Sequence, residues 1–139
     1  MGEVTILKIG SNIIVPIQTS LHDNDARQLQ KDILKKIEIT GTKGLLIDIS
    51  AVSIVDSFLG RLLVETSKMA RLMGTETVLV GMKKEVVLTL IHLGLKLTEL
   101  HTALNIEDGL ALLEGMISKR SRSGRTNGKG TAVTIAEWL

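Results

Sequence analysis

The segment from Leu45 to Gly60 constrains the fold of this chain more than any other. It begins with a short continuous apolar run, which is typical of a strand that is covered on both faces of a sheet. A small turn follows, and apolar residues then recur at helical spacing, which predicts a helix that starts near Ser57. Ser57 is therefore expected at the carboxyl end of a buried strand and at the positive end of a helix dipole.

The rest of the chain repeats this alternation of strand and helix. Strands are predicted over residues 4–9, 13–17, 45–49 and 77–80, with a short extended piece between 96 and 102, and helices over about 23–40, 57–73, 83–93 and 105–117. Turn residues at 10–12 join the first two strands in a predicted β-hairpin. The expected fold class is therefore α/β, with a mixed four- to five-stranded sheet opened by the hairpin and four helices mainly on one face.

Several single residues sharpen these boundaries. Pro16 cannot donate a ladder hydrogen bond, so it is expected at a sheet edge or a strand end. Either Asp23 or Asn24 is expected to cap the first helix, and Gly41 suits a left-handed stop at its end. Asn105 is expected to cap the fourth helix.

Composition limits the class of protein. A chain of 139 residues can form one domain with one core, and with 1% aromatic residues that core must be aliphatic. The absence of cysteine excludes a disulfide framework and cysteine-based zinc sites, and it fits a reducing compartment. The sequence has neither an apolar run of membrane-spanning length nor a signal-peptide pattern, so we expect a cytoplasmic protein with no membrane contact.

Charge is distributed unevenly along the chain. Residues 118–139 hold five of the 17 basic residues and one of the 15 acidic ones, so residues 1–117 carry 12 basic and 14 acidic residues, a net charge of −2. With no basic excess and almost no aromatic residues, this part is not expected to bind nucleic acid specifically. Residues 1–117 are predicted to form the domain, 118–130 a basic flexible linker, and 131–139 an apolar segment that docks on the domain or a neighbour, or is foreign to the protein.

Ser57 is the residue for which function is predicted. The simplest interpretation is a helix cap, since serine is among the best N-cap residues. Its position at the edge where open α/β sheets bind ligands favours a second interpretation, a phosphorylation switch on a small binding domain. The neighbouring Asp56 either caps the helix itself or helps a kinase to recognise the hydroxyl.

Three further residues are candidates for partner binding. Phe58 either anchors the helix in the core or, if exposed, anchors an interface. Gly60 is unfavourable in a helix interior by about 1 kcal/mol, so it indicates close approach of a partner or a neighbouring strand. Asp23 lies in the loop after the second strand, which is expected to approach the Ser57 turn, although helix capping is the favoured explanation of Asp23.

Evidence for an enzyme is weak. The three histidines show no ligand spacing and the carboxylates do not cluster, so neither a metal nor a cofactor is expected. No serine stands in a Gly-x-Ser-x-Gly motif. The segment 124–131 is only faintly similar to a phosphate-binding loop, since it is one residue too short between its glycines and follows no strand.

The Ser57 segment resembles the phospho-acceptor turn of STAS domains, the family of anti-sigma-factor antagonists. The likeness lies in Leu-Leu-Ile-Asp-Ile-Ser at 45–50 and Val-Asp-Ser-Phe-Leu-Gly at 55–60, and continues at 68–74, 77–81, 88–94 and 105–109. It covers residues 4–117. Many antagonists have a small residue after the acceptor, so Phe58 favours the branch of stressosome scaffolds.

The resemblance implies a STAS fold and a protein without enzymatic activity. It implies a scaffold that self-associates and co-assembles with paralogous STAS proteins that carry sensory N-terminal domains. Such a scaffold sequesters a serine/threonine switch kinase, releases it when the matching Ser57 is phosphorylated, and is reset by a phosphatase. Asp23 matches an acidic position near the acceptor. The alternatives are a freestanding anti-anti-sigma factor that binds an anti-sigma kinase when unphosphorylated, and a nucleotide-binding enzyme.

Overall fold

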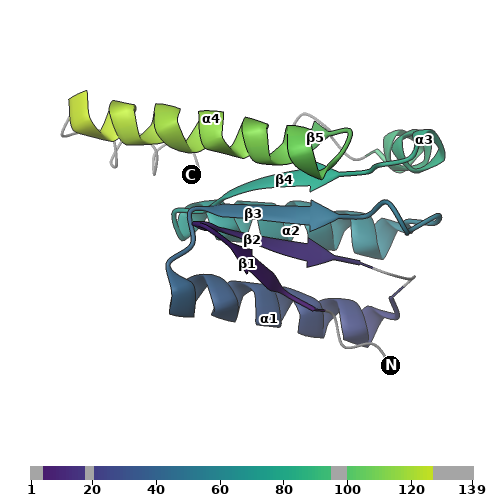
Figure 1. Ribbon diagram of the computed structural model, residues 1–139. Helices are drawn as coiled ribbons and strands as arrows, with labels where there is room; N and C mark the ends of the chain where they lie inside the picture. The colour runs from purple at the N-terminus through teal and green to yellow at the C-terminus, as the bar shows by residue number, and fades with distance from the viewer. Residues whose placement is uncertain (1–4, 18–20, 95–99, 127–139) are drawn as a thin grey trace.

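A computed structural model describes residues 5–17, 21–94 and 100–126, with side chains in the last helix described as far as Arg120. The elements follow the predicted order of strands and helices (Figure 1). They are β1 (Leu7–Ile9), β2 (Asn12–Pro16), α1 (Asp23–Thr40), β3 (Gly44–Asp48), α2 (Ser57–Leu72), β4 (Glu76–Val80), α3 (Lys84–His92), β5 (His101–Ala103) and α4 (Ile106–Thr126).

The five strands form one mixed sheet in the order β1-β2-β3-β4-β5. β1 and β2 form the predicted antiparallel hairpin, in which Leu7 lies opposite Ile14. β2, β3, β4 and β5 run parallel, so their carboxyl ends meet at one edge of the sheet. Pro16 is the last residue of β2, which confirms its predicted place at a strand end. The fold is therefore the expected α/β fold with an opening hairpin.

Helices cover both faces of the sheet, because successive strand residues point to opposite sides. Leu45 and Ile47 of β3 face the larger core, which the buried sides of α1 and α2 and two residues of α3 complete. Leu46, between them, faces a smaller core with Leu113 of α4. Three of the four helices thus lie on one face, in agreement with the prediction of helices mainly on one face, and α4 covers the opposite face. Figure 1 shows α4 and α1 on either side of the strands.

The start of α1 differs from its prediction, whereas its end does not. Four apolar residues at helical spacing are buried against the core: Ala26, Leu29, Ile33 and Ile37. Gly41 ends the helix with a φ of 62°, as expected. Neither Asp23 nor Asn24 is the cap, since the helix begins at Asp23 and the capping position falls on His22, whose side chain makes no capping hydrogen bond. The carboxylate of Asp23 acts through the helix dipole instead.

The start of α4 is fixed by a cap and by a close approach to the sheet. The Asn105 side-chain oxygen accepts a hydrogen bond of 2.8 Å from the Asp108 backbone N–H, as predicted. A Cβ atom at Gly109 would lie 2.5 Å from Val80 Cγ1 and 2.8 Å from Leu46 Cδ1. Only a glycine therefore lets this turn of the helix lie so near the strands.

The second half of α4 extends further than the apolar pattern indicates. The helix continues to Thr126, so the first nine residues of the segment 118–130, expected to be a flexible linker, are helical. Arg120 holds this half on the sheet, because its guanidinium donates a 3.0 Å hydrogen bond to the buried carboxylate of Glu76. The apolar segment predicted over 131–139 lies outside the described residues. Within the described part of the chain, every helix is too short or too polar to cross a bilayer.

Candidate functional site

The turn between β3 and α2 is held in place by three buried side chains. Ile49, Val52 and Val55 are 1%, 1% and 2% exposed and pack into the larger core. The Val52 N–H donates a 3.0 Å hydrogen bond to the Ile49 carbonyl, and this bond closes a tight turn. Ile54, between two of these anchors, is 71% exposed. The turn is therefore rigidly seated yet presents a large apolar side chain to solvent.

Further contacts bind the same turn to the neighbouring strand β4 and to the end of its own strand β3. The Ile49 N–H donates a 3.0 Å hydrogen bond to the Val80 carbonyl, and the Ser50 N–H donates one of 2.9 Å to the Asp48 side chain. Gly81 follows β4 with a φ of 78°, and a Cβ atom there would lie 2.6 Å from the Ser50 Cβ. These contacts fix the path of the chain at the carboxyl edge of the sheet, just before α2 begins.

Asp56, rather than Ser57, caps α2. One Asp56 carboxylate oxygen accepts a 2.8 Å hydrogen bond from the Leu59 N–H. Ser57 is the first helical residue and is half-buried, so part of this residue is open to solvent. No other side chain or backbone group in the described ranges forms a hydrogen bond with that hydroxyl. Two interpretations of Ser57 were predicted. The structure excludes Ser57 as the helix cap, and a phosphorylation site stays a hypothesis.

Phe58 lies between α2 and α1. Its half-buried ring packs against the larger core, and the guanidinium carbon of Arg27 lies 5.1 Å from the ring centroid. Phe58 is thus an anchor of α2 that keeps part of its ring near the surface. Gly60 is buried inside α2, and its N–H donates a 3.0 Å hydrogen bond to the Asp56 carbonyl. The roles of both residues in partner binding stay predictions.

Asp23 is exposed at the start of α1. Because β2 and β3 are parallel neighbours, the connections that follow them lead to the same edge, and Figure 1 shows α1 and α2 both beginning at the arrowhead end of the sheet. Further along, Gln30 of α1 donates hydrogen bonds of 3.1 and 3.0 Å to Glu65 and Thr66 of α2. Among the described residues, no hydrogen bond or ion pair joins Asp23 to Ser57, so its role near the acceptor stays a prediction.

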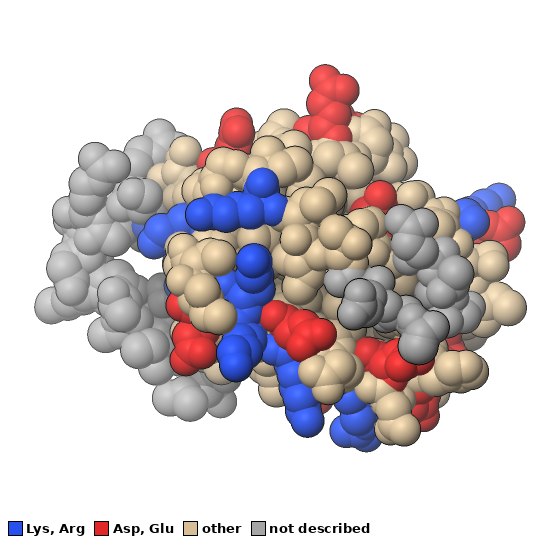
Figure 2. Space-filling model, turned by 60° about the horizontal axis from the view of Figure 1, so that its bottom comes forward, with Lys and Arg blue, Asp and Glu red and all other residues tan. Residues whose placement is uncertain are grey.

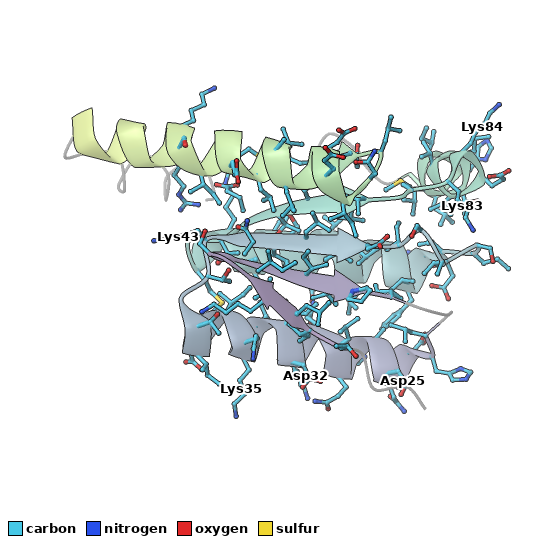
Figure 3. The ribbon with its side chains drawn as sticks, in the orientation of Figure 1. Asp25, Asp32, Lys35, Lys43, Lys83 and Lys84 are labelled. Carbon is cyan, nitrogen blue, oxygen red and sulfur yellow. The ribbon has the colours of Figure 1, made fainter. Side chains whose placement is uncertain are left out.

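Exposed cations also lie at this edge. Lys83 and Lys84 begin α3, and Figure 3 places them at the arrowhead end of the strands. Arg61 is exposed one turn into α2. On the face that Figure 2 shows, basic and acidic residues are interspersed, so this face forms no surface of a single sign. The described residues also contain no cluster of three metal-ligating side chains.

Two features of the site were missed by reasoning from the sequence. Ile54 is 71% exposed next to the buried Val55, and the sequence of this irregular turn does not indicate which of the two apolar residues faces solvent. The contact between Arg27 and Phe58 joins two helices that are distant in sequence, and no local pattern indicates it.

Comparison with known proteins gives consistent results. The sequence model of the STAS domain matches residues 3–109. A serine-to-glutamate variant of RsbS from Moorella thermoacetica is 39% identical with a TM-score of 0.75, over 83% of this chain and 97% of that one. A chain from a structure on the molecular architecture of the stressosome is 42% identical with a TM-score of 0.72, over 81% and 97% of the two chains.

A curated relative is longer than this chain. The RsbT co-antagonist protein RsbRA from Bacillus subtilis (strain 168) is 24% identical over 106 residues. The match covers 76% of this chain and 39% of that protein, so the present chain spans well under half the length of this relative.

Proposed function

This chain belongs to the STAS domain family, and on that premise we propose that it is a non-enzymatic scaffold of a bacterial stress-signalling complex, the stressosome. It acts in the cytoplasm, sequesters a serine/threonine switch kinase, and releases this kinase when Ser57 is phosphorylated. One observation carries the proposal: Ser57 is only half-buried, its hydroxyl has no hydrogen-bond partner in the described ranges, and it follows a turn fixed by buried neighbours. Likeness to RsbS over nearly its whole length supports the same role.

The geometry suits phosphoryl transfer by a bound kinase. The Ser57 oxygen forms a bond to the γ-phosphorus of ATP while the bond from that phosphorus to the bridging oxygen breaks, a base of the kinase takes the hydroxyl proton, and ADP leaves. The acceptor needs no prior hydrogen bond to be broken, because the capping function belongs to Asp56. The kinase therefore meets a hydroxyl without a hydrogen bond, on a backbone that the Asp56 cap fixes.

The charge of the product explains release. A phosphate adds about −1.5 to −2 charges at neutral pH. Inside the domain, repulsion from the Asp56 carboxylate opposes the attraction of the helix N-terminus, which is worth about 0.3–1 kcal/mol for such anions. The fold therefore survives. Across an interface, a like-charge contact costs several kcal/mol, and about 1.4 kcal/mol already lowers affinity tenfold. A phosphatase that removes the group restores binding.

The longer relatives of this chain support an assignment of its partners. RsbRA is named as an RsbT co-antagonist, and most of its length has no counterpart in this chain. We assign such longer paralogues, with sensory N-terminal domains, the role of co-assembly partners, and self-association of this chain accompanies them. Asp23, Asp56, Phe58 and Gly60 are the candidate partner contacts, and Asp56 also caps the helix that begins at Ser57.

Peptide mapping tests the modification. The chain is incubated with its cognate switch kinase and ATP, and the intact mass and the proteolytic peptides are then measured. One phosphate on the peptide that contains Ser57, and none on a Ser57→Ala variant, is the expected result. A phosphate on another residue, or no modification by an active kinase, contradicts the proposal.

Light scattering separates a scaffold from a freestanding antagonist. Size-exclusion chromatography of the chain alone and with its paralogue should give a large mixed assembly, because many weak contacts gain from multivalency. A small species that persists in the mixture argues for the freestanding antagonist. ATP or GTP turnover that survives purification and disappears in Ser57→Ala argues for an enzyme.

A further inference from the structure

Arg61 stands one helical turn after the acceptor. Residues four apart lie on the same face of a helix, so groups at Ser57 and Arg61 are neighbours along the surface of α2. An anion that precedes a cation by four residues also has the orientation that the helix dipole favours. Arg61 is exposed, and within the described ranges it has no ion-pair partner. Its nearest acidic neighbour along the same face, Glu65, accepts a hydrogen bond from Gln30 of α1.

Arg27 approaches the same turn from the other helix. Its guanidinium carbon lies 5.1 Å from the ring centroid of Phe58, the residue directly after the acceptor. The hydrogen bonds from Gln30 to α2 hold the two helices together one turn further on. Arg27 is exposed, and the described part of the chain gives it no carboxylate partner. A guanidinium thus lies over the ring of the residue that follows Ser57, and its hydrogen-bond donors have no protein partner within the described ranges.

We propose that Arg27 and Arg61 form a clamp that binds the phosphate group on phosphorylated Ser57. The inference rests on the proposed function, because it requires the modified serine. A phosphate offers three strong acceptor oxygens, and the planar guanidinium donates to such oxygens in pairs. These charge-assisted hydrogen bonds are stronger than the stacking contact that now holds Arg27, so the side chain moves from the ring to the phosphate.

The clamp changes what the partner meets. In the unmodified protein, two cations stand beside the acceptor and are available to an acidic partner surface. In the phosphorylated protein, both are occupied by the chain's own phosphate, and α1 is tied to the first turn of α2. Phosphorylation therefore adds negative charge and removes two cations from the same surface, which strengthens release of the partner.

Thermal unfolding of a chain with phosphoserine installed at position 57 tests the clamp. Phosphoserine is incorporated during translation, so the test needs no kinase, and mass spectrometry verifies the modification. The melting temperatures of modified and unmodified chains are compared in the wild type, in Arg27→Ala/Arg61→Ala, and in Lys35→Ala/Lys119→Ala. The last variant is the matched control, because it removes the same charge from exposed positions, Lys35 towards the other end of α1 (Figure 3) and Lys119 on α4.

The clamp predicts that phosphoserine raises the melting temperature of the wild type by about 3 °C or more. The control should keep this increment and the double arginine variant should lose most of it. A wild-type increment of zero or less overturns the proposal, and so does an equal increment in the arginine variant, since the helix dipole alone would then explain it. Failure of the kinase to modify Ser57 would instead contradict the proposed function, and the two failures are therefore distinguishable.

Discussion

Replacing Asp56 by alanine removes the side-chain acceptor that begins α2, and we expect the domain to lose about 1 kcal/mol of unfolding free energy. The magnitude follows from one partly buried capping hydrogen bond of 2.8 Å, which the Leu59 N–H donates to Asp56. For a chain of this size, that loss lowers the melting temperature by about 3–5 °C. Asp56→Asn is the matched control, because asparagine keeps an oxygen acceptor and ranks with aspartate as a cap.

Urea unfolding followed by circular dichroism measures this difference, and phosphorylation rates are measured on the same variants. The asparagine variant should stay within about 0.5 kcal/mol of the wild type. If Asp56 also guides the kinase, that variant keeps its stability but is phosphorylated more slowly, which separates the two roles that the sequence left open. An alanine variant as stable as the wild type would refute the conclusion that this carboxylate fixes the start of α2.

Other predictions concern packing and the partner surface. Gly109→Ala should destabilise the domain by about 1–3 kcal/mol through overpacking, whereas Gly115→Ala, with no atom within 4 Å of its added Cβ, should gain up to about 1 kcal/mol in urea unfolding. Arg120→Ala should lower the unfolding free energy by about 2 kcal/mol, because the Glu76 carboxylate loses its ion-pair partner. In a double-mutant cycle, the additional substitution Glu76→Gln should restore part of this loss. Ile54→Ala should weaken kinase binding about tenfold in calorimetry without lowering the melting temperature; unchanged binding removes Ile54 from the interface.

Local patterns were sufficient to predict the element order and the place of Ser57 at the start of a helix. The apolar run at 45–49 and the helical spacing after Ser57 define a buried strand followed by a helix, and the structure has both. Pro16, which lacks a backbone N–H, ends β2. Gly41, which tolerates a positive φ, ends α1. These signals work because each depends on one residue or on one periodic segment.

Features that depend on three-dimensional contacts were not predictable in this way. Asp23 and Asn24 were both predicted as possible caps of the first helix. The helix begins at Asp23 itself, so the capping position falls on His22. Serine, arginine and lysine after residue 117 indicated a linker, whereas the hydrogen bond from Arg120 to Glu76 of β4 helps to hold α4 on the sheet. The exposure of Ile54 likewise depends on which neighbours the turn buries.

The affinity of the switch kinase for this chain, measured before and after complete phosphorylation of Ser57, tests the central claim most directly. Isothermal calorimetry on the intact chain gives both dissociation constants under one set of conditions. We predict that the phosphorylated chain binds about tenfold more weakly or worse, while its circular dichroism spectrum stays unchanged. Equal dissociation constants for the two forms would contradict the account.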